Sequence, residues 1–294
     1  MQRVVSHNFS KWKPSLSEEE LKDCIQSLEN GSVLYFPNLN FAVKPEEKAL
    51  FSSNLVKKDR KNISYNIENN KVKGCLGSID EQAIIHQMMN RFAIYSKDFI
   101  DHLIPHYKKN ISMGRTSFRP VEIKGRENAS LKKNDTLLHI DSFPSTPTHG
   151  KRILRFFANV NPFNVPRVWR LGESHKQVIK RFLPHVKGPI LGMRTLMNRL
   201  GITKSYRILY DHYMLHIHDK MKSDEFYQSK VDQEIVEFPP FTCWLAFTDQ
   251  VSHAAISGQY VFEQSFYLPT DAQLHPDKSP LVYMEKLFQK SLRS

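Results

Sequence analysis

The sequence predicts a mixed α+β protein in which helices support a β-barrel. Three observations lead to this fold class. Helix-start signals and helical spacing occur in the first hundred residues, alternating apolar segments follow later, and a metal-ligand pattern is divided between two of those segments. A length of 294 residues with 40% hydrophobic content is enough for one large core. We therefore expect residues 1–294 to form a single domain.

Residues 1–110 are expected to form a flank of helices with an occasional strand. Ser17 precedes three glutamates, which is typical of a helix N-terminus. Residues 33–36 are apolar and predict a strand. Ser78 and Glu81 fit a capping box, and helical spacing continues from there to about Leu103.

The barrel strands are expected in two blocks, residues 111–162 and residues 237–269. Alternating or continuous apolar character within these blocks predicts individual strands at residues 115–123, 137–143, 152–161, 237–247 and 259–269. Pro120 places the first of them near a sheet edge or bulge.

Between the blocks, residues 163–236 are expected to be a basic helical insertion with no clear strand pattern. Within it, His212 and His216 are four residues apart and form an alternative metal pair, although packing or surface histidines are the favoured interpretation because no third ligand is evident. The tail, residues 270–294, is expected to carry an amphipathic helix. That helix either docks on its own domain or touches a membrane.

The net charge of +12 points to a polyanionic partner. The possible partners are a phosphorylated substrate, an anionic membrane surface or nucleic acid, and no nucleic-acid-binding signature supports the last. Three widely spaced cysteines indicate reduced thiols. The start lacks a signal-peptide core, and no apolar run could span a bilayer. A cytoplasmic location is therefore expected. The basic residues gather between Ser174 and Lys222: Lys176, Lys180, Arg181, Lys187, Arg194, Arg199, Lys204, Arg207, Lys220 and Lys222.

His139, Asp141 and His253 are the candidate metal ligands and catalytic residues. In an extended strand His139 and Asp141 point to the same face. His253 follows a second apolar segment. Two histidines and one carboxylate are the ligands of non-haem Fe(II) oxygenases, which leave one octahedral face open. A lone His-x-Asp is common without a metal, but here it lies in an apolar segment, where unpaired polar groups are costly.

Such a site is expected to use 2-oxoglutarate and O2, and the cosubstrate needs a basic anchor. Many such enzymes place an arginine about ten residues after the distal histidine, but here Glu263 and Gln264 occupy that region. The anchor is instead expected on the strand after the His-x-Asp. Arg155 is the first choice with Arg152 as alternative, and Asn159 and Gln264 are the accompanying polar contacts. Surface charge on an edge strand is the competing interpretation.

Around these residues the chain resembles the Kdo 3-hydroxylase (KdoO) family. The resemblance runs from about Arg115 to Pro269, through His139–Gly150, Arg152–Arg155, Asn159–Pro162, Pro166–Trp169 and Ser252–Tyr260. It implies a double-stranded β-helix (jelly-roll) core and an Fe(II)- and 2-oxoglutarate-dependent dioxygenase, with ascorbate as a stimulant. The implied reaction is hydroxylation of C3 of Kdo (3-deoxy-D-manno-oct-2-ulosonic acid) to Ko in the lipopolysaccharide inner core. The implied substrate is a Kdo-bearing lipid A precursor, met by a peripheral protein at the cytoplasmic face of the inner membrane.

The resemblance also implies roles for individual residues. It implies that His139, Asp141 and His253 bind iron, and that one or more of Arg115, Arg119 and Arg126 meets the Kdo carboxylate. Which of these arginines serves sugar or cosubstrate stays open. His149 is a further expected substrate contact near the site mouth, with an ordinary loop histidine as the alternative.

Two alternatives remain at this point. The same iron chemistry could act on a protein or nucleic-acid group, as in JmjC-like or AlkB-like hydroxylases. A non-catalytic cupin-like protein could bind a polyanion or glycolipid, although it would not need all three candidate ligands.

Overall fold

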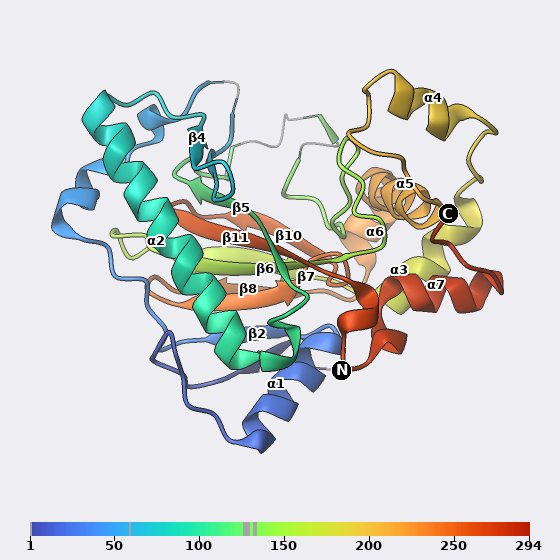
Figure 1. Cartoon of the computed structure of the whole chain (residues 1–294), viewed down its shortest axis with the longest axis horizontal. Helices are drawn as coiled ribbons and strands as arrows, with labels where there is room; N and C mark the ends of the chain where they lie inside the picture. Colours follow the sequence, from blue (N-terminus) through green and yellow to red (C-terminus); the bar gives the residue numbers. More distant parts are fainter. Residues whose placement is uncertain (1, 59, 126–129, 132–133) are drawn as a thin grey trace.

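The computed structural model describes residues 2–58, 60–125, 130–131 and 134–294, and two β-sheets lie at its centre (Figure 1). Within these residues the large sheet has the order β1-β2-β9-β6-β11-β5-β3-β4 and the small sheet the order β10-β7-β8. Neighbouring strands are antiparallel except β1 and β2. The strands are β1 (Val4–Ser6), β2 (Val33–Phe36), β3 (Ile63–Asn66), β4 (Lys71–Lys73), β5 (Ser112–Arg119), β6 (Arg152–Asn159), β7 (Arg167–Leu171), β8 (Glu234–Phe238), β9 (Cys243–Phe247), β10 (His253–Ser257) and β11 (Val261–Leu268).

Helices cover the large sheet and form a lobe beside it (Figure 1). They are α1 (Glu18–Glu29), α2 (Ile79–Leu103), α3 (His175–Phe182), α4 (Met193–Arg199), α5 (Leu209–Ser223), α6 (Glu225–Lys230) and α7 (Pro280–Phe288). The helix starts predicted at Ser17 and Ser78 are confirmed, each with a complete capping box. We call α3 to α7 the helical lobe. No described helix combines the length and apolar character needed to cross a bilayer.

The register of β6 decides which side chains point toward the space between the sheets. Phe156 packs under α2, with its ring centroid 5.3 Å from that of Phe99. Its neighbour Phe157 points the other way and packs against Trp169 of the small sheet and Trp244. Arg155 has the same parity as Phe157, so it also points between the sheets. The predicted α+β jelly-roll architecture is confirmed.

Three expected boundaries were wrong. Strands β1 to β4 of the N-terminal flank are part of the large sheet, because their backbones extend its two edges. The helical insertion begins and ends with strands, because β7 and β8 pair with each other in the small sheet. The single strand expected at residues 237–247 is divided between the two sheets, because the chain turns at Phe241, which has φ +65°.

The segment 137–143 is extended but does not form the expected regular strand. Its only ladder contact among the described residues is an isolated bridge between His139 and His253. The side chain of Gln228 takes the place of a neighbouring strand. Its Oε1 accepts from the Leu138 amide at 2.8 Å, and its Nε2 donates to the Leu138 carbonyl at 2.9 Å. These backbone groups are thereby satisfied without a ladder.

The tail helix docks on its own domain. Leu281 and Met284 of α7 are buried in the core of the helical lobe with Val178 of α3. The helix ends at Phe288, earlier than expected, because Gln289 adopts a left-handed conformation with φ +52°.

His175, at the start of α3, is expected to make the protein less stable in mild acid. It is 4% exposed, and burial together with the nearby Arg152 charge lowers its pKa to about 3. In the unfolded chain the pKa is about 6.5. Below pH 6.5 the unfolded chain therefore binds a proton that the folded chain does not, and stability falls as pH drops toward 3. Between pH 7 and pH 5 the loss from this group is about 2 kcal/mol.

Urea denaturation at both pH values measures this loss. A His175→Gln variant controls for all other titrating groups, so its loss between pH 7 and pH 5 should be smaller by that amount. Equal losses in the two proteins would contradict the assignment to His175.

Candidate metal centre

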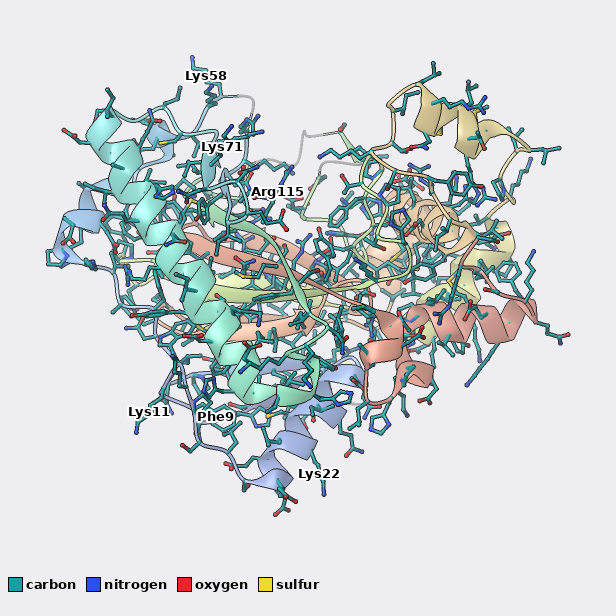
Figure 2. All side chains as sticks on the ribbon, viewed as in Figure 1. Phe9, Lys11, Lys22, Lys58, Lys71 and Arg115 are labelled. Atoms are coloured by element: carbon teal, nitrogen blue, oxygen red, sulfur yellow. The ribbon has the colours of Figure 1, made fainter. Side chains whose placement is uncertain are left out.

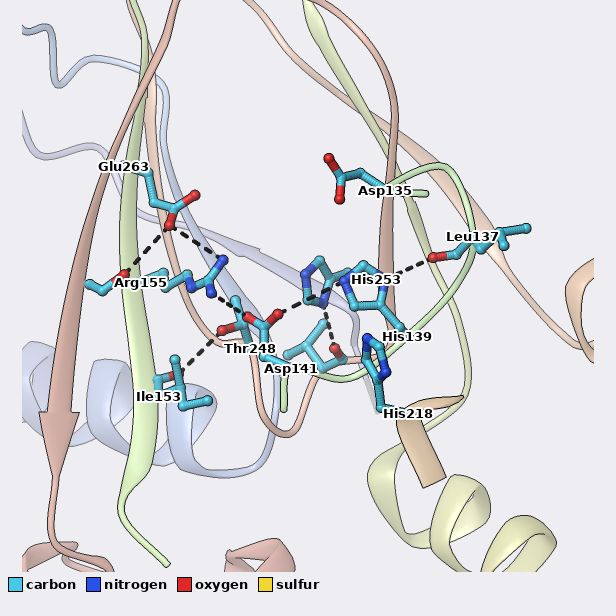
Figure 3. Close-up of polar contacts among 12 residues, drawn as sticks. Asp135, Leu137, His139, Asp141, Ile153, Arg155, His218, Thr248, His253 and Glu263 are labelled. Atoms are coloured by element: carbon cyan, nitrogen blue, oxygen red, sulfur yellow. Dashed lines mark hydrogen bonds and ion pairs between the residues drawn. The ribbon is translucent and has the colours of Figure 1, made fainter. Parts of the chain in front are cut away.

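His139, Asp141 and His253 lie together in the structure (Figure 3). One donor atom from each lies within 4.8 Å of the other two, and all three residues are buried. Backbone pairing brings them there. The amides and carbonyls of His139 and His253 bond reciprocally at 3.0 and 2.9 Å, and the Asp141 amide donates to Thr248 at 2.8 Å. The two predicted ligand segments are therefore directly joined, although they are far apart in the sequence.

Both imidazoles are oriented by hydrogen bonds on the side away from the cluster (Figure 3). Nδ1–H of His139 donates to the Leu137 carbonyl at 2.7 Å, and Nδ1–H of His253 donates to the Val251 carbonyl at 2.9 Å. This leaves each Nε2 as an unprotonated lone pair. Burial lowers the pKa of both histidines, with a further decrease at His139 from the nearby His253. Both imidazoles are therefore neutral, which is the form in which a histidine binds a metal.

Asp141 supplies the negative charge of the cluster. Burial raises the pKa of its carboxyl, but Arg155 and His253 outweigh burial and hold the pKa below its usual value. Its Oδ2 lies 3.1 Å from Arg155 Nη2 yet makes no hydrogen bond of regular geometry. A buried carboxylate oxygen that lacks a regular hydrogen bond and lies beside two neutral imidazoles is suited to bind a divalent transition metal.

The three side chains line a cavity of about 300 Å³ between the sheets and α5. Its described walls carry four cationic and four carboxylate side chains, so they are balanced in charge. A divalent metal would leave the cavity with two positive charges, which suits a dianionic ligand. The charged lining residues are Arg119, Arg155, Arg167, Lys222, Asp135, Asp141, Asp219 and Glu263.

Arg155 and Arg119 are held at the cavity wall by Glu263. Arg155 Nη1 lies 3.3 Å from Glu263 Oε1, and Arg119 donates to Glu263 Oε2 from Nε at 3.0 Å and Nη2 at 2.7 Å. Burial raises the pKa of Glu263, but the two guanidinium groups outweigh it and keep the carboxylate ionised. The residue at the expected arginine position therefore orients two arginines from neighbouring strands.

The other predicted cosubstrate residues do not line the cavity, so the structure does not bring them to the metal cluster. Arg152 and Gln264 are on the opposite faces of their strands from Arg155 and Glu263. Gln264 accepts a hydrogen bond from Thr116, and Asn159 donates to the carbonyls of Phe238 and Val165. These amides stabilise the sheet.

Of the predicted substrate residues, Arg119 lines the cavity and two others do not. Arg115 is exposed on β5 outside the lining (Figure 2). His149 is exposed with φ +55°, and its Nε2–H donates to the Tyr206 carbonyl at 2.9 Å. Both therefore lie away from the cavity in this structure. Arg126 lies outside the described residues.

Arg152 is expected to contribute to stability and not to ligand binding. It is fully buried and donates to Asp249 Oδ2 at 2.7 Å and to Gln273 at 2.7 Å. An Arg152→Met variant leaves the Asp249 carboxylate buried without its cation, which costs about 3–5 kcal/mol. Urea denaturation should show this loss, while the dissociation constant for 2-oxoglutarate stays within about twofold.

The double variant Arg152→Met/Asp249→Asn is the control, because it removes the buried charge as well. It should recover much of the lost stability. A large rise in the 2-oxoglutarate dissociation constant of a folded Arg152→Met protein would restore Arg152 as an anchor.

Sequence reasoning missed several residues at the cavity, among them two from β7 and two from α5. Arg167 and Trp169 come from β7, whose side chains alternate in burial but not in hydrophobicity, so the strand propensity of Val168 and Trp169 was the available signal. Burial and repulsion from Arg119 lower the pKa of Arg167 to about 9, and Trp169 stacks on His253 at 5.1 Å. His218 and Lys222 come from α5, and His218 lies edge-on to His139 at 5.4 Å.

The alternative metal pair, His212 and His216, belongs to a different part of α5. Their ring centroids are 4.4 Å apart, but His212 Nε2–H donates to the Lys187 carbonyl at 3.0 Å. Among the residues that the structure describes, only the His139 cluster offers three donor groups close enough to share one ion.

Comparisons with known proteins agree with this geometry. Residues 11–291 match the family model described as 3-deoxy-D-manno-oct-2-ulosonic acid (Kdo) hydroxylase. The crystal structure of the Kdo hydroxylase KdoO with α-ketoglutarate and Fe(III) is 42% identical, with a TM-score of 0.95 over 99% of this chain and 97% of that one. KdoO with cobalt(II) is also 42% identical, with a TM-score of 0.97 over 100% and 98% of the two chains. KdoO with succinate and Fe(III) is 42% identical, with a TM-score of 0.96 over 100% of this chain and 98% of that one. A search of curated protein sequences found no match.

Proposed function

The chain belongs to the Kdo hydroxylase family of non-haem Fe(II)- and 2-oxoglutarate-dependent dioxygenases, and we propose that it hydroxylates C3 of Kdo on a lipid A precursor to give Ko. The buried cluster of His139, Asp141 and His253, which opens into a charged cavity, is the observation that carries this proposal. α-Ketoglutarate is another name for 2-oxoglutarate, and KdoO has been crystallised with it, with iron and with succinate.

His139 and His253 would hold Fe(II) through Nε2, and Asp141 through a carboxylate oxygen. When bound, the iron supplies the redox chemistry that couples O2 and 2-oxoglutarate to hydroxylation, with succinate and CO2 as coproducts. The chain's part is to present two neutral imidazoles and one carboxylate in fixed orientations. Ascorbate is expected to stimulate turnover by keeping the iron reduced.

Arg155 would bind the distal carboxylate of 2-oxoglutarate. Its guanidinium points into the cavity beside Asp141, and its Nε has no hydrogen-bond partner. A planar guanidinium offers two parallel donors to a carboxylate. Glu263 would keep that plane fixed while the ligand enters and leaves.

Arg119, Arg167 and Lys222 would meet the Kdo carboxylate. All three line the same cavity as the metal cluster. Arg167 is the strongest candidate, because its buried charge has no carboxylate partner within ion-pair distance among the described residues, and its Nη1–H donates only to the Gly258 carbonyl. Phe143, Phe157 and Trp169 in the lining would exclude water from the reacting C–H bond.

A membrane-bound substrate accounts for the charge of the protein. Lipid A phosphates and the Kdo carboxylate are anionic, and a net charge of +12 attracts the protein to them. We therefore propose a peripheral protein at the cytoplasmic face of the inner membrane.

Mass spectrometry of Kdo2-lipid A after incubation with the protein, Fe(II), ascorbate and 2-oxoglutarate tests the function. The expected result is the gain of one oxygen on the Kdo moiety, lost when either iron or 2-oxoglutarate is omitted. No gain from a folded, iron-loaded protein would refute this substrate. Succinate release stimulated by a peptide or oligonucleotide would then identify an oxygenase with another substrate.

A further inference from the structure

Exposed apolar side chains gather on one short segment of the helical lobe, residues 190–202. Leu191 is fully exposed, Ile190 is 71% exposed and Leu200 is 65% exposed. Figure 1 shows α4, within this segment, at the outer edge of the lobe beyond α5. We call the following six side chains the apolar surface: Ile190, Leu191, Met193, Leu196, Leu200 and Ile202.

The apolar surface includes one exposed face of α4. Met193, Leu196 and Leu200 follow the i, i+3, i+7 spacing of a single helix face, and no residue of α4 is buried. In an ordinary amphipathic helix this face would lie against the core. A contiguous exposed apolar surface of this kind marks a site of interaction.

The charged residues next to the apolar surface in the sequence are all basic, and Asp219 of α5 lies behind it in the lining of a cavity. The sequence contains no aspartate or glutamate between Glu173 and Asp211. Lys187, Arg199 and Lys204 are exposed on either side of the apolar residues. Apolar residues flanked by lysine and arginine are typical of segments that lie in the headgroup region of an anionic bilayer, with the apolar face among the acyl chains.

The segment is tied to the mouth of the metal cavity. The Lys204 amide donates to the Ser145 carbonyl at 2.9 Å, and the Arg207 guanidinium donates to the carbonyl of Pro144, which lines the cavity. A second cavity of about 630 Å³ separates the segment from α5, and the two cavities share Leu215 and Asp219 in their linings. A lipid surface bound at residues 190–202 would therefore lie next to the entrance of the site.

We propose that the apolar surface inserts into an anionic lipid leaflet and so presents the cavity to amphiphiles held in that leaflet. A second copy of this chain is a poorer partner, because an isologous contact would bring the exposed Lys187, Arg199 and Lys204 of both copies together. Nucleic acid would satisfy the lysines and arginines but would leave the fully exposed Leu191 in water. The proposal rests on the proposed function only for the identity of the amphiphile.

Cosedimentation with vesicles tests insertion without any turnover. The full chain is expected to bind phosphatidylglycerol-containing vesicles and to bind neutral phosphatidylcholine vesicles less well. Leu191→Glu and Leu196→Glu should each lower the partition coefficient by at least about tenfold, because each removes a leucine from the acyl region and adds a negative charge.

Ile79→Glu is the matched control. Ile79 is 86% exposed at the start of α2, outside the helical lobe, so this variant also places a glutamate at a highly exposed aliphatic site. It should bind vesicles like the unmodified protein. Equal binding by the Leu191 variant would overturn the proposal, and so would a fall in oligomer mass in the Leu191 variant without loss of vesicle binding.

Insertion depth is measured with a Leu191→Trp variant and vesicles of brominated phospholipid. Quenching of the added tryptophan, absent in Ile79→Trp, is the expected result, and its absence would show adsorption by charge alone and refute insertion. The same measurements distinguish failure of the proposed function from failure of membrane insertion. If only the proposed function is wrong, the protein still binds vesicles but transfers no oxygen to Kdo. If only insertion is wrong, the protein still hydroxylates a lipid-free Kdo glycoside.

Discussion

Asp141→Ala is expected to abolish hydroxylation, with a fall of about three orders of magnitude or more. The substitution removes the only carboxylate of the metal cluster and leaves two neutral imidazoles, which hold a divalent ion weakly. The protein should stay folded, because Arg155 keeps its contact with Glu263. Metal analysis after dialysis, circular dichroism and the mass-spectrometric assay measure the three quantities.

Asp135→Ala is the matched control for this variant. Asp135 also lines the cavity, but its carboxylate lies 2.8 Å from Lys61 and is not part of the cluster. The control should retain one iron per chain. Normal product formation by Asp141→Ala, or equal iron loss in both variants, would refute the ligand assignment.

Arg155→Met is expected to raise KM for 2-oxoglutarate by about a hundredfold. The guanidinium is buried at the cavity wall, so a ligand carboxylate there would lose a charge-assisted pair of hydrogen bonds. Because the lost contact would be made in both ground and transition states, kcat at saturating 2-oxoglutarate should change much less. Initial rates over a 2-oxoglutarate series separate the two constants.

Arg119→Met distinguishes the two arginines that Glu263 holds. If Arg155 is the anchor, the Arg119 variant keeps its KM for 2-oxoglutarate and loses affinity for the Kdo substrate. The reverse pattern would assign the cosubstrate to Arg119. Arg155→Lys should fall between the unmodified protein and Arg155→Met, since it keeps the charge but not the planar fork.

Local signals in the sequence predicted the parts of the site that depend on nearest neighbours. The spacing of His139 and Asp141 placed both side chains on one face, and the structure brings them together even though their segment is not a regular strand. The helix starts at Ser17 and Ser78 were predictable for the same reason, because a capping box is complete within four residues.

Strand parity explains why some of the predicted cosubstrate residues do not line the cavity. Arg152 and Arg155 differ by an odd number of positions, so a regular strand cannot direct both into the cavity, and the same holds for Glu263 and Gln264. In a regular strand, at most one residue of each pair can therefore point into the cavity. Which member faces inward depends on the packing of α2 against β6, which the sequence does not reveal locally.

The residues missed at the cavity arrive from distant elements. Arg167 and Trp169 lie on a short strand between a proline-containing turn and α3, and His218 and Lys222 lie on α5. The first two reach the cavity through the pairing of β7 with β10 and β8, and the last two through packing of the helical lobe. The sequence shows that these side chains are basic or aromatic, but it does not show that they meet at one cavity.

The bridge between His139 and His253 has a consequence for the order of events during synthesis. The first two candidate ligands leave the ribosome long before the third, and the backbone pairing that positions them closes a long loop, an entropically slow step. All three ligands can bind the metal only after His253 has been synthesised. A truncated or stalled chain that lacks His253 therefore holds no iron at this site. The loaded metal in turn opposes reopening of the loop by mass action, with a gain in stability that grows with free metal concentration.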